Sequence, residues 1–245
     1  MKKVLLIIPA FNEEANILPV ARKLDAFCSS HKGQNPDYSI DYIVINDGSG
    51  DRTAEICRNN DIPVISLVKN LGIGGAVQTG YKYALQEQYD VAVQFDGDGQ
   101  HDIESLDQVI LPILRNEADF TVGSRFIEKN EGNFQSTRFR RMGIFILSGV
   151  MRLFGRVRIL DCTSGYRGAG RCAIAYLSED YPVDYPEPES LIQIAKRGYR
   201  IVEVPVTMFE REGGTSSIRL WKSCYYMIKV TLAIMIASIQ RKENH

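Results

Sequence analysis

The chain has 245 residues but no stretch of about 20 uncharged apolar residues, the length that a helix needs to cross a bilayer. We therefore expect no clear transmembrane helix. The N-terminal run MKKVLLIIPAFNEE starts with basic residues, yet only a short apolar stretch precedes Pro9 and the acidic Glu13 and Glu14. This pattern predicts a first strand rather than a signal peptide.

The chain also lacks an excess of charge of one sign and a regular spacing of cysteines. The formal net charge is −1, so composition gives no argument for binding nucleic acid, and any anion must be bound by a local cluster. The five cysteines are odd in number and scattered, and they include no C-x-x-C pair. They argue against a disulfide framework or structural zinc and fit a reducing cytoplasm.

No internal repeat, low-complexity tract or sharp change in composition marks a domain boundary. The first half instead alternates continuous apolar runs with helical patterns, which is typical of a mainly parallel α/β sheet covered on both faces. The expected strands are 3–10, 41–47, 62–69, 91–95 and 118–124, and the expected helices are 14–30, 53–59, 74–88 and 103–115.

The second half breaks this rhythm. Pro205 would confine a last strand to an edge or a bulge, because proline cannot donate to a sheet ladder. We interpret the whole as one domain with a C-terminal elaboration. The expected elements are a helix over 141–155, a Gly-rich loop over 161–171, a helix over 189–199 capped by Gly198, and a strand over 200–209.

The most informative segment follows the fourth strand, where VQFDGDGQHD sets Asp96, Asp98 and Asp102 after a short apolar run. Acidic side chains at i and i+2 on a Gly-rich turn can bind one hard cation through oxygen. A cation held by one or two carboxylates takes its other ligands from water and substrate phosphates. The segment predicts a metal site for a nucleoside diphosphate, and a solvated Asp-Gly turn is the alternative.

Two other strand ends carry weaker signals. In PAFNEE, Asn12 is a good helix N-cap, whereas Phe11 suits stacking on a base. In NDGSGDRT, Asp47 would bond to a base or ribose, or would only shape a strand-to-helix turn in which Asp51 or Thr53 caps the helix. The segment NLGIGGAVQTG fails the dinucleotide fingerprint, because Val77 stands where glycine is needed, and it lacks the Gly-Lys-Ser/Thr of a phosphate P-loop.

Several arginines follow strand or loop signals, and the guanidinium group binds oxyanions in a bidentate fork. We expect these side chains to gather at one edge of the sheet and to bind phosphate, although a solvated charge is the simpler explanation for any one of them. They are Arg125, Arg138, Arg140, Arg141, Arg167, Arg171 and Arg211.

Together these segments resemble the inverting GT-A glycosyltransferases of family 2, and within them the polyprenyl-phosphate sugar transferases of the dolichyl-phosphate mannose synthase kind. The resemblance runs from about Val4 to Ser217. The motifs occur in the family's order: IIPAFNEE, VINDGSGDRT, NLGIGGAVQTGY, QFDGDGQHD, VGSRF, DCTSGYR, and KRGYRIVEVPV ahead of REGGTSS. The resemblance implies a GT-A domain over 1–217, with a Rossmann-like, mainly parallel sheet, and a C-terminal helix within 218–245.

The resemblance also implies roles for individual residues. The nucleoside pocket would be lined by Pro9, Phe11, Glu13, Ile45 and Asp47. The metal motif would be Asp96, Gly97 and Asp98, with Asp98 and Gln100 as direct ligands of Mg²⁺ or Mn²⁺. Arg125, Arg138 and Arg211 would contact phosphate of the donor or the acceptor, and Asp161 would lie near the reaction centre.

Three positions depart from the family pattern. The usual Asp-Asp pair after the second strand is Asn46-Asp47 here, which keeps the residue that matches the nucleoside contact. Ile73 and Ser217 stand where a lysine is often found, so two possible phosphate contacts are missing. We expect these changes to affect the choice of nucleotide or sugar rather than the class of reaction.

The acceptor follows from charge. A polyprenyl phosphate is already an anion and needs arginines more than a general base, so Arg125 and the arginines of 138–141 favour it. A hydroxyl acceptor, as in a cell-wall or surface polysaccharide, would need a carboxylate base within hydrogen-bond reach, for which Asp161 and Asp102 are the candidates.

The segment 218–240 combines an apolar body with a basic face formed by Arg219, Lys222 and Lys229. It is typical of a helix at a membrane surface, and packing on its own domain or on a second subunit is the alternative. We expect a cytoplasmic protein, peripheral at the inner face of the membrane, that acts on a nucleoside diphosphate sugar, as a homo-oligomer or with a separate membrane partner.

Two other classes of protein remain to be distinguished. A sugar-phosphate nucleotidyltransferase should carry a Gly-rich basic loop after the first strand, and PAFNEE is neither. A non-catalytic binding module would not need a DGDG segment together with loop arginines.

Overall fold

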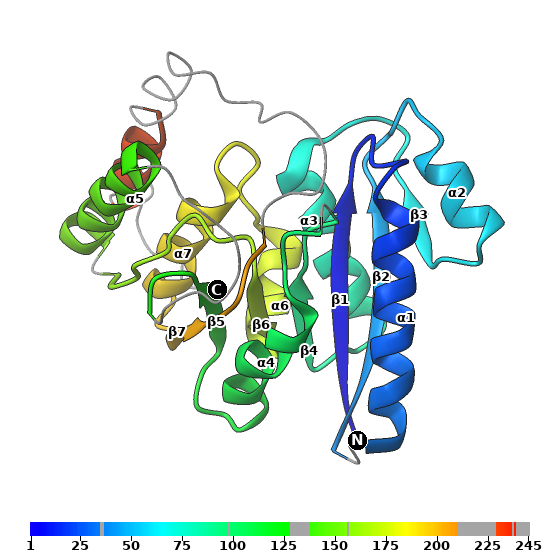
Figure 1. The fold of residues 1–245 in the computed structure, drawn as a ribbon. Helices are drawn as coiled ribbons and strands as arrows, with labels where there is room; N and C mark the ends of the chain where they lie inside the picture. Colours follow the sequence, from blue (N-terminus) through cyan, green and yellow to red (C-terminus); the bar gives the residue numbers. More distant parts are fainter. Residues whose placement is uncertain are drawn as a thin grey trace.

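The computed structural model describes residues 1–34, 37–97, 99–127, 138–155, 157–209, 229–236 and 238. In these residues one seven-stranded sheet has the order β3-β2-β1-β4-β6-β5-β7, with helices on both faces (Figure 1). The strands are β1 (Lys2–Ala10), β2 (Tyr38–Asn46), β3 (Val64–Ser66), β4 (Val91–Gln94), β5 (Phe120–Ser124), β6 (Arg167–Gly170) and β7 (Ile201–Pro205). The α-helices are α1 (Ile17–Gln34), α2 (Thr53–Asn59), α3 (Gly72–Gln86), α4 (Leu106–Leu114), α5 (Arg138–Val150), α6 (Arg171–Glu179) and α7 (Pro186–Lys196).

Strand β1 is the centre of the parallel part of the sheet, between β2 and β4. Its alternate side chains enter two different cores. Val4, Leu6 and Ile8 pack with α1 and α4, whereas Leu5 and Ile7 pack with α3 and α6. A strand that is buried on both faces reads as a continuous apolar run, which explains the first signal in the sequence.

The largest departure from expectation lies at 167–170, inside the segment expected to be a loop. These residues form β6, which pairs antiparallel with both β4 and β5. Its sequence, RGAG, has little strand propensity, so the pattern did not reveal it. Packing requires the small residues, because a Cβ on Gly168 would lie 2.5 Å from the Oγ1 atom of Thr121 and 3.1 Å from a methyl group of Val109 on α4.

Helix α1 begins at Ile17, later than expected, and Asn12 does not cap it. Asn12 has a φ of +56°, and its side-chain Oδ1 accepts a hydrogen bond from the amide of Gly50 at 2.9 Å. The backbone carbonyl of Glu13 instead accepts the amide of Ile17 at 2.9 Å. The polar side chain that suited a cap therefore joins two loops.

Other elements agree with the sequence and differ mainly in extent. Strand β3 is much shorter than the 62–69 expected, and β7 lies at the sheet edge and ends at Pro205, as that proline requires. Gly198 follows α7 with a φ of +81° and donates to the carbonyl of Ala195 at 3.0 Å. Beyond α5 the chain continues as a π-helical turn, η2 (Met151–Gly155).

The described part of the C-terminal segment packs on the domain itself. Val230 and Ile234 are fully buried in the core shared with α5 and α7, whereas Leu232 and Ile236 are exposed. The remainder of 218–245 lies outside the described residues, apart from 229–236 and 238. No helix in the described part of the chain has the length and apolar character needed to cross a membrane.

Candidate active site

Strands β1, β2, β4 and β5 all end at one edge of the sheet, and the antiparallel β6 begins there. Ligands of α/β proteins bind at the carboxyl ends of parallel strands. This edge gathers the loops that carry Phe11, Asp47, Asp96 and Arg125. The loop after β4 lies against the end of β1, because a Cβ on Gly97 would lie 3.3 Å from the carbonyl oxygen of Pro9.

The loops after β1 and β2 are joined by hydrogen bonds. The amide of Glu13 donates to the Oγ1 atom of Thr53 at 2.9 Å, and the amide of Glu14 donates to Asp51 at 3.0 Å. Partial burial acts to raise the pKa of Asp51, but hydrogen bonds from Thr53 and from the Glu14 amide hold that pKa below its ordinary value. An ionised Asp51 thus stabilises both loops.

The residues expected to line the nucleoside pocket differ in what they present to a ligand. Phe11 is 48% exposed and is available for stacking. Asp47 is 3% exposed, and its Oδ1 atom accepts the amide of Leu71 at 2.7 Å, so one carboxylate oxygen holds the start of α3. Ile45 is fully buried in the core, which contradicts a direct contact between its side chain and a nucleoside in this conformation.

Asp96 lies directly beyond β4 and faces several polar groups. Its Oδ2 atom lies 3.4 Å from the Nε2 atom of His101, and its Oδ1 atom lies 3.5 Å from the side-chain amide nitrogen of Gln94. The carboxamide oxygen of Gln94 in turn accepts the hydroxyl of Tyr181 at 3.5 Å. Gln100 is half-buried on the same loop, whereas Asp98 lies outside the described residues.

The DCTSGYR segment contacts the loop after β4. A Cβ on Gly165 would lie 2.8 Å from the Oδ2 atom of Asp96, so only glycine leaves room for this carboxylate. The ring of Tyr166 stacks on His101 with centroids 4.6 Å apart, and its hydroxyl donates to the carbonyl of Asp102 at 3.3 Å. Two motifs that are distant in sequence thus form one structure.

Arg125 and Asp161 form a buried, bidentate ion pair. The Nε and Nη2 atoms of Arg125 each lie 2.6 Å from a different carboxylate oxygen of Asp161. The side chains of Arg125 and Asp161 are 5% and 0% exposed. Glu203 on β7 accepts the amide of Asp161 at 2.7 Å, which fixes the loop that carries this carboxylate.

The other candidates for acid–base and phosphate roles are Asp102 and the arginines Arg138, Arg140, Arg141 and Arg211. The carboxylate of Asp102 accepts the amide of Glu104 at 3.3 Å and the hydroxyl of Ser105 at 3.4 Å, which is the geometry of a helix cap. Arg141 on α5 is exposed, with its guanidinium 5.6 Å from the ring centroid of Phe126. Arg211 and the side chains of Arg138 and Arg140 lie outside the described residues.

All the candidate arginines were expected at one edge of the sheet, and for Arg171 this expectation is wrong. Arg167 begins β6 at the carboxyl edge, whereas Arg171 follows the far end of this strand, which is about 13 Å long. Arg167 is fully buried. Its guanidinium donates to the carbonyls of Ser164, Cys162 and Glu187 and to the hydroxyl of Ser190, at 2.6–3.0 Å.

Glu187 lies in the first turn of α7, beside Arg167. Burial raises the pKa of its carboxyl group, the charge of Arg167 opposes this effect, and the charge of Asp96 adds to it. The contact that the structure gives for Glu187 is with Arg167, whose guanidinium donates to the Glu187 carbonyl at 2.6 Å.

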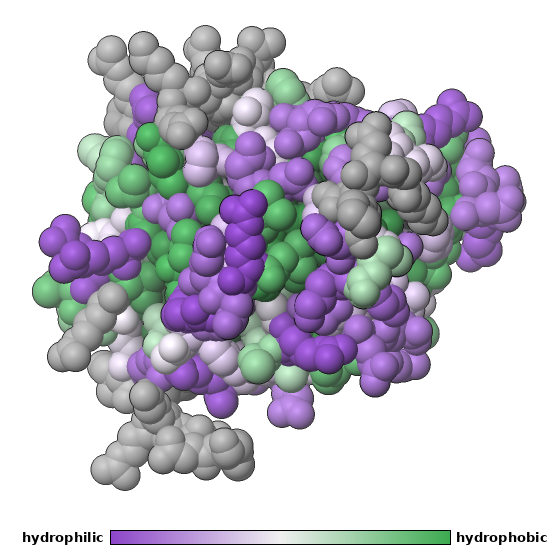
Figure 2. All heavy atoms as spheres, turned by 90° about the horizontal axis from the view of Figure 1, so that it is seen from below, coloured by the Kyte–Doolittle hydropathy of each residue, from purple (hydrophilic) through white to green (hydrophobic). Residues whose placement is uncertain are grey.

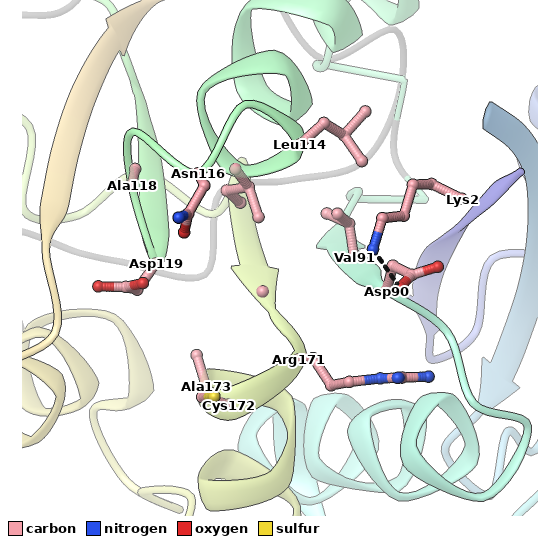
Figure 3. A pocket seen from close by; sticks show the side chains of 12 residues that line it. Lys2, Asp90, Val91, Leu114, Asn116, Ala118, Asp119, Arg171, Cys172 and Ala173 are labelled. Carbon is pink, nitrogen blue, oxygen red and sulfur yellow. Dashed lines mark hydrogen bonds and ion pairs between the residues drawn. The ribbon is translucent and has the colours of Figure 1, made fainter. Parts of the chain in front are cut away.

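A hollow of about 310 Å³ lies at the opposite end of the sheet, near the start of β1 and β4 (Figure 3). Its charged groups already have partners: Lys2 pairs with Asp90 at 3.0 Å, Asp119 pairs with Arg200 from outside the hollow at 3.0 Å, and Arg171 donates to the carbonyl of Gln88 at 3.2 Å.

Seen from this end, hydrophilic side chains predominate on the side of α1 and α2, and apolar ones are more frequent on the side of α5 (Figure 2). The carboxyl edge, and not this hollow, is where the polar motifs meet.

The residues at the carboxyl edge fit a divalent cation that is shared with a substrate. Asp96 and Gln100 supply a carboxylate and an amide oxygen on one loop, and hard cations prefer oxygen ligands. The described residues contain no group of three or more His, Cys, Asp or Glu side chains able to hold a metal ion. Such a site would complete its coordination with Asp98, water and the phosphates of a nucleotide.

Sequence reasoning named the loops but missed two side chains that complete them. His101 and Tyr166 contact the loop after β4 and each other, and the sequence pattern assigned neither of them a role there. The only available signal was position, because each belongs to a motif that was already singled out or borders one.

Comparisons with known proteins show the family of the chain. A family model described as glycosyl transferase family 2 matches residues 5–181. The chain is 32% identical to the UDP-N-acetylglucosamine–dolichyl-phosphate N-acetylglucosaminyltransferase of Methanococcus voltae, over 94% of this chain and 97% of that protein. It is 28% identical to the polyprenol monophosphomannose synthase of Mycolicibacterium smegmatis, over 89% of this chain and 81% of the relative.

The fold has close counterparts among solved structures. Glucosyl-3-phosphoglycerate synthase of Mycobacterium tuberculosis, in complex with Mn²⁺, UDP and phosphoglyceric acid, superposes with a TM-score of 0.69 at 18% identity. The alignment covers 99% of this chain and 80% of that one. The chain therefore belongs to glycosyl transferase family 2, and it is a glycosyltransferase with the GT-A fold.

Proposed function

We propose that this glycosyltransferase transfers a sugar from a nucleoside diphosphate sugar to a polyprenyl phosphate, with inversion at the anomeric carbon and with Mg²⁺ or Mn²⁺ bound by Asp96, Asp98 and Gln100. The observation that carries the proposal is the meeting of the Asp96 loop with the 161–167 segment at the carboxyl edge. Relatives named for transfer to dolichyl phosphate and to polyprenol support the acceptor.

The donor would lie across the loops after β1, β2 and β4. Phe11 is exposed for stacking on the base. The loop that carries it is held in place by hydrogen bonds to the loop around Asp51. A bound divalent cation would neutralise the charge that develops on the leaving β-phosphate. Asp96 and Gln100 would hold this cation at the end of β4, opposite the nucleoside.

The acid–base geometry favours an anionic acceptor. A hydroxyl acceptor needs a carboxylate base, yet both oxygens of Asp161 are bonded to Arg125, and those of Asp102 cap a helix. A polyprenyl phosphate attacks with an oxygen that already bears charge, so it needs no base. Arg125, Arg138 and Arg211 remain our candidates for binding phosphate.

The surface of α5 supports an acceptor that resides in a membrane. Met142, Phe145 and Ile146 are each more than 50% exposed and lie at the i, i+3, i+4 spacing of one helix face. Leu153 on the following turn is 74% exposed, and the exposed Arg141 and Arg152 add positive charge. An apolar face with basic residues suits an anionic lipid surface, so we place the enzyme peripherally at the inner face of the cell membrane.

The test is release of nucleoside diphosphate from UDP-, GDP- and dTDP-sugars with Mg²⁺ or Mn²⁺, with and without undecaprenyl phosphate. Release from one donor that depends on the lipid supports the proposal, and proton NMR of the product gives the anomeric configuration. Slow hydrolysis without lipid dependence would instead favour the second candidate, transfer to a hydroxyl of a cell-wall or surface polysaccharide.

The metal assignment has its own prediction. Asp98→Asn should abolish turnover, because the change removes a charged ligand of the cation while preserving the size of the side chain. Asp61→Asn, in the turn after α2, is the matched control and should leave the rate unchanged. Normal turnover by Asp98→Asn would refute the metal motif.

A further inference from the structure

His101 is a buried imidazole beside the metal motif to which the proposed reaction assigns no step. The residue is 3% exposed, although it lies on a loop at the edge of the sheet. Its Nδ1 atom accepts the backbone amide of Asp96 at 2.9 Å. Since this nitrogen accepts a hydrogen bond, the proton of the neutral ring is on Nε2.

The protonated Nε2 atom faces the carboxylate of the same aspartate. It lies 3.4 Å from the Oδ2 atom of Asp96, while the amide nitrogen of Gln94 lies 3.5 Å from the Oδ1 atom. Both separations are slightly longer than an ordinary hydrogen bond, and contacts of this kind often tighten when a substrate binds. The carboxylate thus lies between two N–H donors, one at each oxygen.

The ring is held in place on several sides. Tyr166 stacks on it with an interplanar angle of 12°, and Phe95 meets it edge-on with centroids 5.4 Å apart. The backbone of His101 forms a β-bridge with Met208, beyond β7. A ring fixed by these contacts can set the direction of a carboxylate that it touches.

We propose that His101 is a positioning residue that orients the Asp96 carboxylate toward the cation and the donor diphosphate. The inference deepens the proposed function and depends on it. A carboxylate ligand is normally oriented by outer hydrogen bonds, and loss of such a partner typically lowers metal affinity by about 10- to 100-fold. His101 and Gln94 are the partners that the structure assigns to Asp96.

Two substitutions separate the two contacts of the ring. In His101→Asn, the side-chain oxygen can replace Nδ1 as the acceptor for the Asp96 amide, but no donor takes the place of Nε2 at the Oδ2 atom of the carboxylate. In His101→Gln, the longer side chain can bring its amide nitrogen to the place of Nε2, but the Asp96 amide loses its acceptor. The contact that each variant retains predicts a different defect.

Binding of Mn²⁺ in the presence of UDP, or of GDP or dTDP if the wild type uses that donor, is measured without acceptor from the electron paramagnetic resonance signal of the free ion. We expect His101→Asn to weaken binding by about 10-fold or more and His101→Gln to remain within about 3-fold of the wild type. Thermal midpoints should show the reverse order. His101→Gln should melt roughly 3 °C below His101→Asn, because it leaves a buried amide without an acceptor.

His31→Asn is the matched control, because His31 also packs on an aromatic ring, that of Phe27, far from the site on α1. It should bind Mn²⁺ and UDP like the wild type. Wild-type binding by His101→Asn, or equal loss of binding in both folded His101 variants, would overturn the inference. If His101→Asn does not fold, a wild-type Mn²⁺ affinity of His101→Gln supports the inference and a 10-fold loss overturns it.

Failure of the proposed function would look different. In that case the wild-type protein itself would show no Mn²⁺ binding with UDP, GDP or dTDP and no lipid-dependent turnover with any donor. A wild type that binds and turns over, with His101 variants that match it, would reject only the role of His101.

Discussion

At the scale of single residues, the site is built around charges that are withdrawn from water. Arg125 and Asp161 are almost completely buried and satisfy each other with two bonds of 2.6 Å. Burying ions is costly, and the cost is offset only when the geometry is good and both partners are present. The two residues therefore stabilise the fold only together. Removing one of them leaves the other as a buried charge without a partner, which lowers the free energy of unfolding.

We predict that Asp161→Asn lowers the free energy of unfolding by about 3 kcal/mol, because Arg125 is left as a buried cation without a counter-charge. Urea denaturation followed by circular dichroism measures this loss. Adding Arg125→Met should restore part of the stability. Unchanged stability together with lost turnover would show that Asp161 acts at the reaction centre rather than through Arg125.

A second residue-scale prediction concerns Gly165. In Gly165→Ala, the new methyl group would lie 2.8 Å from the Oδ2 atom of Asp96, so the carboxylate must move. We expect turnover to fall at least 10-fold while the fold is retained, because the loop can shift by a few tenths of an ångström. Gly50→Ala is the control for steady-state rates, because a Cβ on Gly50 would have no atom within 4 Å.

Residue roles were only partly predictable from the sequence. The sequence pointed to the loop that carries Asp96, because a carboxylate after a buried strand is a local signal. It did not reveal that Asn12 joins two loops or that His101 touches Asp96, since both contacts depend on the position of another loop. Ile45 shows the converse, because its motif position suggested a pocket while its side chain enters the core.

At the scale of elements, strands that are buried on both faces were the easiest to predict. Continuous apolar runs such as Val4–Ile8 leave little alternative. Strand β6 was missed for the opposite reason: its small residues suit the narrow space between β4, β5 and α4 and have no strand pattern of their own. Missing that strand also misplaced Arg171, which lies beyond its far end.

Helix α5 leads to a prediction at the scale of elements. Replacing Phe145 and Ile146 by serine should lower turnover of undecaprenyl phosphate in anionic vesicles by about 10-fold, because the exposed apolar face no longer enters the lipid surface. Vesicle co-sedimentation should fall in parallel. Rates with a short, water-soluble polyprenyl phosphate should not change, and a fall there would assign these side chains to the protein core or the acceptor site.

At the scale of the whole molecule, acid sensitivity follows from carboxylates that join distant segments. Asp119, ahead of β5, accepts three hydrogen bonds from Arg200, ahead of β7. The side-chain hydrogen bonds of Arg200 hold the pKa of Asp119 below its ordinary value of 3.8. A lowered pKa stabilises the fold above the unfolded value, and this contribution is lost as the pH falls through the folded one.

We therefore expect Asp119→Asn to be less stable than the wild type at pH 7, with the difference shrinking to zero as the pH falls below 3.8. Thermal midpoints between pH 7 and pH 3 test this expectation. Asp61→Asn is the control, because no such ion pair of Asp61 is found within the described residues. Its thermal midpoint should equal that of the wild type across that range. A difference independent of pH would mean that Asp119 stabilises the fold without its charge.

The place of β6 in the sheet has a consequence for synthesis on the ribosome. Its partners β4 and β5 are complete long before residue 167 is made, because α5 and its flanking segments intervene. At roughly 5–20 residues per second, the nascent chain carries the unpaired edges of both strands for a period on the order of seconds. Open strand edges recruit other chains, so translation that pauses ahead of β6 should yield aggregates, and chaperones that shield this interval should raise the yield of active enzyme.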